Sequence, residues 1–385
     1  MYFKALFFLF FIILISPGLD FFYYIFGISL ETLKKVSFNG MLVCALLYQL
    51  NKNIYITFES LLFLLFSILT LCLGFYFHGI VKYSLLHIYA TIIPIFMISF
   101  GIHFYRSCTT DILNFLQKLL IYALVINLIF LALYIVFQHI LDIWGYYGFG
   151  TSLALLSAYI LSQNRHALFL FVFLIDIFSG KRSSFVGMIF LFLVNRGFFI
   201  SNFTKRNLLM ASIFPLILIY LFMNIDTFEF LRRFAFLRDV DLDDGVSIML
   251  ATGGRATEVI SIIEWIDGDI VKWLLGSGIG ASYDYIDPRL QFSVEKLHYA
   301  HFSPFSYILV YGSIFTFLLY CAFFYRLYSG LIYKNNYFYL SFAFLFFSSF
   351  FGSILFVNPM PWFFLGVVIE MIKNPRNEIQ FKNQL

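Results

Sequence analysis

The sequence predicts an all-α, polytopic integral membrane protein of about twelve transmembrane helices, with one large polar loop before the last few. Of the 385 residues, 62% are hydrophobic and only 12% are charged. A soluble domain carries roughly 25% charged residues, so the composition excludes the soluble classes. The 55 phenylalanines and 26 tyrosines suit lipid-facing surfaces and interfacial belts.

Apolar runs fill most of the chain, and a spanning helix needs roughly 20 residues. The first run, Ala5 to Ile15, is followed by Ser16-Pro17-Gly18 and by further apolar sequence from Phe21. Because a small-residue cleavage site is lacking, we expect a first span that is broken or re-entrant, not a signal peptide. The remaining runs cover about 36–50, 57–77, 83–104, 119–140, 146–163, 167–179, 183–199, 207–224, 302–325, 337–357 and 361–372.

One polar stretch, from Asp226 to His301, interrupts this pattern and holds most of the acidic residues. Only eight of the 21 acidic residues lie elsewhere, namely Asp20, Glu31, Glu59, Asp111, Asp142, Asp176, Glu370 and Glu378. The sequence therefore predicts three parts. These are an N-terminal bundle of about nine spans (1–225), a large loop (226–300), and about three further spans with a cytoplasmic tail (301–385).

The basic residues between spans predict the orientation, because cytoplasmic loops are enriched in Lys and Arg. With the N-terminus inside, thirteen fall on the cytoplasmic side: Lys4, Lys52, Arg106, Lys118, Arg165, Arg196, Lys205, Arg206, Arg326, Lys334, Lys373, Arg376 and Lys382. The opposite short loops hold five, namely Lys34, Lys35, Lys82, Lys181 and Arg182. The large loop is then expected outside the cytoplasm, with both termini inside.

Neither a metal site nor a nucleic-acid partner is expected. The four cysteines, Cys44, Cys72, Cys108 and Cys321, lie in or beside apolar runs, which argues against disulfides and thiolate metal sites. The net charge of +4 is modest. The acidic turn 239–245 fails the EF-hand pattern, since Asp244 and Leu250 stand where Gly and Glu are required.

Three patches of the loop carry candidate binding residues. The segment 228–238 mixes aromatic residues with Arg232 and Arg233, which is typical of a surface-lying helix and could also hold a lipid phosphate. Gly253 and Gly254 precede Arg255, and a helix beginning there would offer backbone amides and a guanidinium to an anion.

The predicted helix places Ile260, Ile263 and Ile266 at near-helical spacing, with Glu258 elsewhere around it. Downstream, the glycine-rich segment 276–280 lacks the context of a nucleotide loop. His298 and His301 precede the next span, where either could be a polar anchor or a general base.

Taken together, these motifs resemble those of the O-antigen polymerase and O-antigen ligase superfamily. The resemblance covers roughly residues 179–325 and rests on the order of four motifs. They are Ser179-Gly180-Lys181-Arg182-Ser183-Ser184, Gly253-Gly254-Arg255, Leu274-Leu275-Gly276-Ser277-Gly278-Ile279-Gly280, and His301 with Gly312 eleven positions later. Ligases usually place Asn, Ser or Gln after the histidine, whereas this chain has Phe302.

The resemblance implies a metal-independent, membrane-embedded glycosyltransferase of the GT-C-like type in the bacterial inner membrane, with its active site facing the periplasm. The implied donor is an undecaprenyl-pyrophosphate-linked oligosaccharide, and no cofactor is expected. It implies catalytic roles for Arg182, Arg255 and His301. The arginines would offset leaving-group charge, and His301 would act as general base. Lys181, Arg232, Arg233 and His298 are expected to bind substrate.

We expect a polymerase that joins repeat units of a surface polysaccharide in the synthesis of lipopolysaccharide. Its partners would be membrane lipids and a chain-length regulator. The alternative within the superfamily is a ligase that moves glycan onto lipid A-core. A flippase is the alternative from another class, but it would be favoured by repeated halves and charged mid-span residues, which the sequence lacks.

The charge bias generates a first prediction, on topology. Reporter fusions at Asp243 are expected to read as periplasmic, and fusions at the C-terminus as cytoplasmic, because the thirteen-to-five bias of basic residues orients the spans. A cytoplasmic signal at Asp243 would contradict the orientation and an extracytoplasmic active site with it.

Overall fold

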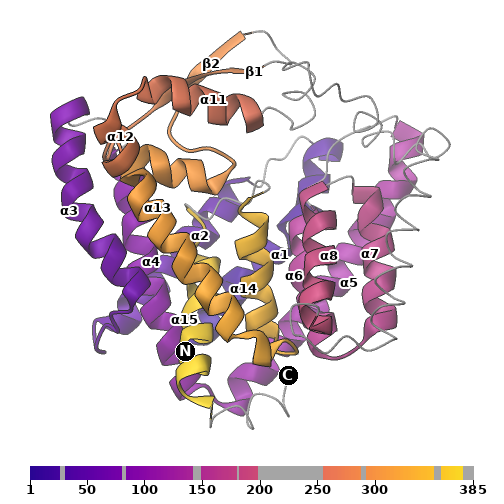
Figure 1. Cartoon of the computed structure of the whole chain (residues 1–385). Helices are drawn as coiled ribbons and strands as arrows, with labels where there is room; N and C mark the ends of the chain where they lie inside the picture. The colour runs from indigo at the N-terminus through magenta and orange to yellow at the C-terminus, as the bar shows by residue number, and fades with distance from the viewer. Residues whose placement is uncertain are drawn as a thin grey trace.

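A computed structural model of the chain describes residues 1–26, 31–79, 84–141, 149–179, 182–197, 255–287, 292–350 and 357–375 (Figure 1). Of the described residues, 83% are helical. The elements are α1 (Tyr2–Phe26), α2 (Glu31–Gln49), α3 (Phe58–His78), α4 (Ser84–Ser107), α5 (Thr110–Leu141), α6 (Phe149–Ser162), α7 (His166–Ser179), α8 (Arg182–Arg196), α11 (Arg255–Ile266), α12 (Ile270–Leu275), β1 (Tyr283–Asp287), β2 (Phe292–Leu297), α13 (Ser303–Ser329), η2 (Leu331–Tyr333), α14 (Tyr337–Ser348) and α15 (Pro359–Lys373).

Four helices in the described part are long and apolar enough to cross a membrane: α3, α4, α13 and the first 25 residues of α5, Thr110–Tyr134. Shorter apolar helices accompany them, among them α6, α7, α8 and α14. The helices are those of a multi-pass membrane protein, as the composition predicts. The count of about twelve spans stays a prediction.

Helix α1 continues through Pro17, so the predicted break at this residue is not present. Proline lacks an N–H and would leave the carbonyl of Ile13 without its helical donor. The Ser16 hydroxyl donates to that carbonyl at 2.8 Å. The Asn127 side chain from α5 donates to the carbonyl of Leu14 at 2.9 Å. One local side chain, Ser16, and one from another helix, Asn127, therefore keep α1 intact.

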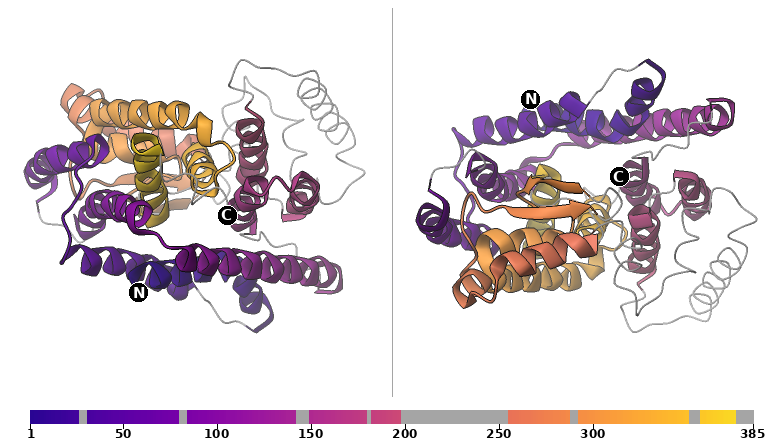
Figure 2. Two further views of the ribbon diagram at one scale, coloured as in Figure 1. Left: turned by 90° about the horizontal axis from the view of Figure 1, so that it is seen from below. Right: turned by 90° about the horizontal axis from the view of Figure 1, so that it is seen from above.

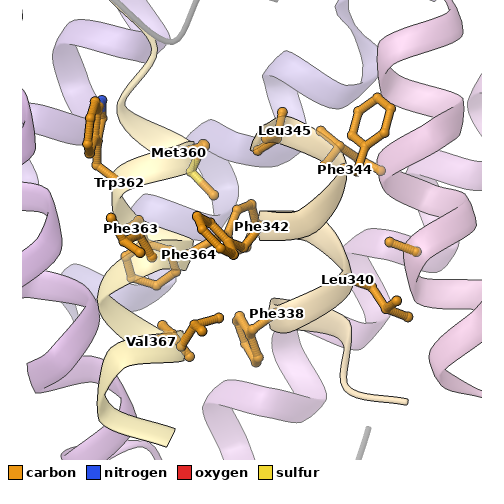
Figure 3. Packing of buried hydrophobic residues seen from close by; sticks show 14 of the residues in the cluster. Phe338, Leu340, Phe342, Phe344, Leu345, Met360, Trp362, Phe363, Phe364 and Val367 are labelled. Carbon is orange, nitrogen blue, oxygen red and sulfur yellow. The ribbon is translucent and has the colours of Figure 1, made fainter. Parts of the chain in front are cut away.

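The centre of the bundle is the contact between α4 and α15, where two glycines let the backbones approach. A Cβ at Gly101 would lie 2.2 Å from the Phe363 carbonyl oxygen, and one at Gly366 would lie 2.1 Å from that of Ile98. Aromatic side chains fill the space between α15 and α14 (Figure 3). The ring centroids of Phe338 and Phe364, for example, lie 6.1 Å apart. Helices α1, α2 and α5 line one side of the molecule in both views of Figure 2.

The two ends of the bundle differ. At the start of α4, His87 bonds the backbone of His298, whereas at its end Arg106 bonds Glu370 near the end of α15. Phe3 packs on Phe104 at this second end. The start of α1 and the end of α15 therefore lie opposite α11, α12 and the strands, as Figure 1 shows. The predicted sidedness of the loop and of both termini stays a prediction.

Two buried carboxylates near the second end are paired with arginines. Arg106 binds Glu370 through Nε and Nη2, at 2.7 and 3.1 Å, and Arg326 Nε donates to Glu59 at 2.8 Å. Leaving either carboxylate unpaired among apolar helices would be costly. The pairs tie α4 to α15 and α3 to α13.

The described part of the predicted loop folds into a cap, defined here as residues 255–287 and 292–302. Helices α11 and α12 pack with an antiparallel hairpin in which Tyr283 pairs with Leu297 and Tyr285 with Val294. Its small core includes Ile262, Ile266, Ala281, Tyr283, Tyr285, Ala300 and Leu309. The predominance of helix is consistent with the predicted all-α class, to which the described residues add this short hairpin. Alternation in Tyr283-Asp284-Tyr285 buries both tyrosines and leaves Asp284 exposed.

Candidate functional site

The segment 298–303, which leads into α13, is held by main-chain contacts from several elements. The carbonyl of His298 accepts from His87 Nε2 of α4 at 3.0 Å, and that of Tyr299 from the Tyr283 hydroxyl of β1 at 3.2 Å. Ser306 of α13 bonds both the N–H and the carbonyl of Ala300, at 2.8 and 2.9 Å. The N–H of Ser303 donates to the carbonyl of Ser349, just past α14, at 3.1 Å. The segment is thereby rigid, and it presents His301.

His301 and Glu258 form a two-point contact. The His301 backbone N–H donates to Glu258 Oε2 at 2.8 Å, and ring Nδ1 lies 2.7 Å from Oε1. The Glu258 side chain is 5% exposed and the His301 side chain 52%. An ionised carboxylate only accepts, so Nδ1 carries the proton of the neutral ring. Among the described residues Nε2 has no hydrogen-bond partner, so it can accept a proton on the other side of the ring.

Glu258 is the residue that sequence reasoning missed. The sequence predicted Ile260, Ile263 and Ile266 as the apolar positions of this helix. In the structure Thr257, Glu258, Ile262 and Ile266 are buried, while Ile260 and Ile263 are exposed, so the predicted face is wrong. His301 determines which face of α11 is buried. It bonds both carboxylate oxygens of Glu258, which could not otherwise be buried. The available signal was the i, i+4, i+8 spacing of Glu258, Ile262 and Ile266.

Arg255 is the first residue of α11, one turn before Glu258. Its side chain is half-buried, and within the described part of the chain it makes no hydrogen bond or ion pair. A guanidinium in the first turn of a helix can pair with an anion, which the positive end of the helix dipole also favours. The structure therefore brings Arg255 onto the same short helix as the partner of His301. Gly253 and Gly254 lie outside the described residues.

Arg182 begins α8, but its side chain lies outside the described residues, as do Lys181, Arg232 and Arg233. The neighbouring motif residue Ser184 is buried and donates to Asp176 Oδ2 of α7 at 2.8 Å. The contact joins the two helices on either side of the motif. The roles predicted for Arg182, Lys181, Arg232 and Arg233 stay predictions.

His298 is buried, unlike His301. Its Nδ1 lies 3.3 Å from the Ala281 carbonyl, which can only accept, so this nitrogen carries a proton. Burial lowers the pKa of His298, against the opposing effect of the bond to Ala281, and nearby Lys296 lowers it further. The ring is thus neutral near pH 7. Its ring centroid lies 6.3 Å from that of His87 in α4, so His298 joins the cap to the bundle. The substrate-binding role expected of His298 stays a prediction.

The glycine-rich motif and Gly312 meet in the structure. Gly312 has φ 84° and ψ 171° inside α13, which bends there (Figure 1). The backbone N–H groups of Ser277 and Gly278 donate to the carbonyls of Leu309 and Val310, at 2.9 and 3.1 Å. The N–H of Ile279 donates to the carbonyl of Thr70 in α3 at 3.0 Å. These glycines therefore dock the cap onto two helices, and nothing in this contact requires a nucleotide.

The approach is close enough to exclude any side chain. A Cβ at Gly276 would lie 2.3 Å from the Val310 carbonyl oxygen, and one at Gly312 2.2 Å from that of Leu274. A Cβ at Gly278 would lie 2.2 Å from the backbone nitrogen of Gly74. The spacing of eleven residues between His301 and Gly312 therefore sets the distance from the exposed imidazole to the contact between the cap and α13 at Gly312.

Among the described residues, no group of three or more His, Cys, Asp or Glu side chains is placed to hold a metal ion. The acidic turn 239–245 lies outside the part of the chain that the structure describes. The expectation of metal independence therefore stays a prediction.

No family model, curated protein or solved structure matches this chain. The resemblance to O-antigen polymerases and ligases consequently rests on its motifs. Any functional proposal for the chain must be supported by the geometry around His301 and Glu258.

The docking contact generates a prediction for Gly312→Ala, with Gly79→Ala as its matched control. Gly79 has a similar backbone conformation, φ 67° and ψ −157°, but a Cβ there would meet nothing within 4 Å. Both variants incur backbone strain of about 1–3 kcal/mol. Only Gly312→Ala adds the steric clash, which costs about 1–3 kcal/mol more. Thermal unfolding in detergent is expected to show the larger loss for Gly312→Ala. Equal losses would mean that the contact with Leu274 is not tight.

Proposed function

We propose that this protein is a polysaccharide polymerase that transfers glycan from an undecaprenyl-pyrophosphate donor to a hydroxyl of another lipid-linked repeat unit. The carrying observation is the contact between His301 and Glu258, which occupies Nδ1 of an exposed imidazole and, within the part of the chain that the structure describes, leaves Nε2 without a partner. Arg255, one turn before Glu258, supports the proposal because this reaction needs both a base and a cation. The motifs in the chain supply the substrate class.

In the proposed reaction, the acceptor hydroxyl oxygen forms a bond to the anomeric carbon of the donor sugar. The bond from that carbon to the pyrophosphate oxygen breaks, and lipid pyrophosphate leaves with the electron pair. His301 Nε2 takes the hydroxyl proton, as a general base does. Glu258 holds the ring in the required tautomer and stabilises the imidazolium as it forms, a role known for carboxylates behind catalytic histidines.

The leaving group gains negative charge as the bond breaks, so preorganised cations lower the barrier. Arg255 is assigned this role because its guanidinium and the N-terminus of α11 both favour an anion. Arg182 is assigned the second cationic position on the strength of its motif alone. No other group is required for the atoms and charges to balance.

Phe302 favours the polymerase over the ligase. The side chain of Phe302 is half-buried, and its ring centroid lies 5.6 Å from that of Phe305 and 6.1 Å from that of Phe350. An apolar wall thus adjoins His301, where ligases place a small polar side chain. We infer an acceptor pocket of different shape from that of a ligase.

The proposed roles generate a prediction for point variants. His301→Ala is expected to lower glycan extension by about 10²–10⁴-fold, the usual contribution of a general base. Arg255→Ala and Arg182→Ala are expected to abolish extension, and Arg→Lys to restore it poorly because Lys lacks the bidentate fork. His298→Ala should have a milder effect. Extension is measured with purified protein and lipid-linked donor, at matched protein levels.

Glu258→Gln separates a positioning role from general damage. We expect a reduced kcat with little change in the KM for the donor, because the imidazole loses its orientation but the donor site is kept. Glu264→Gln, on the exposed side of the same helix, is the matched control and should keep normal activity. Near-normal activity of His301→Ala would remove the general-base assignment, and near-normal activity of Glu258→Gln would remove the positioning role.

A deletion strain distinguishes polymerase from ligase. Loss of a polymerase leaves a separate ligase to attach single units, so lipopolysaccharide capped with one repeat is expected. Loss of a ligase would instead leave bare core and long chains on undecaprenyl pyrophosphate. Gel analysis of lipopolysaccharide and of extracted lipid-linked glycan reads out both. Bare core with lipid-linked polymer would overturn the polymerase proposal.

A further inference from the structure

Helix α12 presents an apolar face that the described part of the protein leaves uncovered. Ile270, Val271 and Leu274 are 64%, 43% and 38% exposed. Positions i, i+1 and i+4 share one side of a helix, so the three side chains form one patch. Trp273 packs instead on the small core of the cap. Hydrating three large aliphatic side chains is unfavourable, and a neighbouring apolar phase would remove this cost.

The helices beneath α12 carry exposed apolar stripes. On α3 the stripe includes Leu65, Ile68, Leu71 and Phe75, and on α13 it includes Phe317 and Phe324. Both helices are long and apolar enough to span a membrane. Because such stripes on spanning helices face lipid, the bilayer extends along both.

Helix α12 sits against these two helices. Its Lys272 Nζ lies 5.5 Å from the centroid of the Phe77 ring in α3, and the residues after it bond the backbones of α3 and α13. Figure 1 shows α12 beside the upper part of α3, above the bend of α13. Helix α12 therefore stands at the upper end of these two helices, with its apolar patch on the side away from Lys272.

Lys272 has the surroundings of an interfacial residue. Its Nζ lies 5.0 Å from the centroid of the Trp265 ring and 3.8 Å from Asp269 Oδ2. Lysine can bury its aliphatic stem and place its ammonium at the level of lipid phosphates, and tryptophan is enriched at the same level. The cation complements a phosphate-bearing surface, although Asp269 offsets part of its charge.

We propose that α12 lies in the boundary between headgroups and acyl chains of the bilayer that the protein spans. Ile270, Val271 and Leu274 turn into the acyl region, and Lys272 faces the phosphates. The contacts of α12 with two spanning helices that carry exposed apolar stripes favour lipid over a second protein as the occupant. The contact tethers the cap to the membrane surface and fixes its height.

Site-directed spin labelling in proteoliposomes of phosphatidylethanolamine and phosphatidylglycerol tests this proposal. Val271→Cys and Leu274→Cys are introduced into a background in which the native cysteines are replaced by serine. Two further labelled positions serve as references. One is the native Cys321, an exposed residue of α13, in a variant that retains no other cysteine. The other is Glu264→Cys, on the exposed side of α11. Power saturation compares accessibility to oxygen, which partitions into lipid, with accessibility to a water-soluble nickel chelate.

At Val271 and Leu274 we expect an oxygen-to-nickel accessibility ratio severalfold higher than at Glu264 and lower than at Cys321. Such a ratio places α12 between water and the bilayer centre. A ratio equal to that at Glu264 would show that the face is in water and would overturn the proposal. Low accessibility to both reagents would show that protein covers the face, and would overturn it equally.

Discussion

Backbone polar groups surrounded by apolar helices and lipid must be satisfied by the protein itself, and this structure depends on how that requirement is met at Gly312. The bend in α13 leaves the carbonyls of Leu309 and Val310 to outside donors, and the amides of Ser277 and Gly278 supply them. Glycine is needed on both sides because the chains approach too closely for side chains. The cap is thereby joined to the bundle through backbone contacts.

The chemistry of the candidate site follows from the same docking. Once the cap is seated, α11 lies against the segment before α13, and Glu258 reaches both the backbone and the ring of His301. A buried carboxylate next to an exposed imidazole is a polar pair at an otherwise apolar boundary. The pair is stable only because each group satisfies the other, so position and tautomer of the imidazole are fixed together.

Composition and hydropathy were sufficient to predict a helical membrane protein, because they depend on the solvent and not on particular contacts. The elements that were missed depend on tertiary partners. Ser16 and Asn127 preserve α1 across Pro17, which no local rule for proline anticipates. His301 and Arg255 were found from their motifs. Glu258 was not, because its burial depends on a partner, His301, that lies 43 residues away in the sequence.

The contacts of His87 imply an order of assembly. Its ring accepts the N–H of Gly280 at Nδ1, 193 residues further along the chain, and donates to the carbonyl of His298, 211 residues further. Because α4 is synthesised before residues 280 and 298, neither of these hydrogen bonds can form until the cap has been made. The contacts that hold the segment bearing His301 against α4 therefore form after most of the chain has been synthesised.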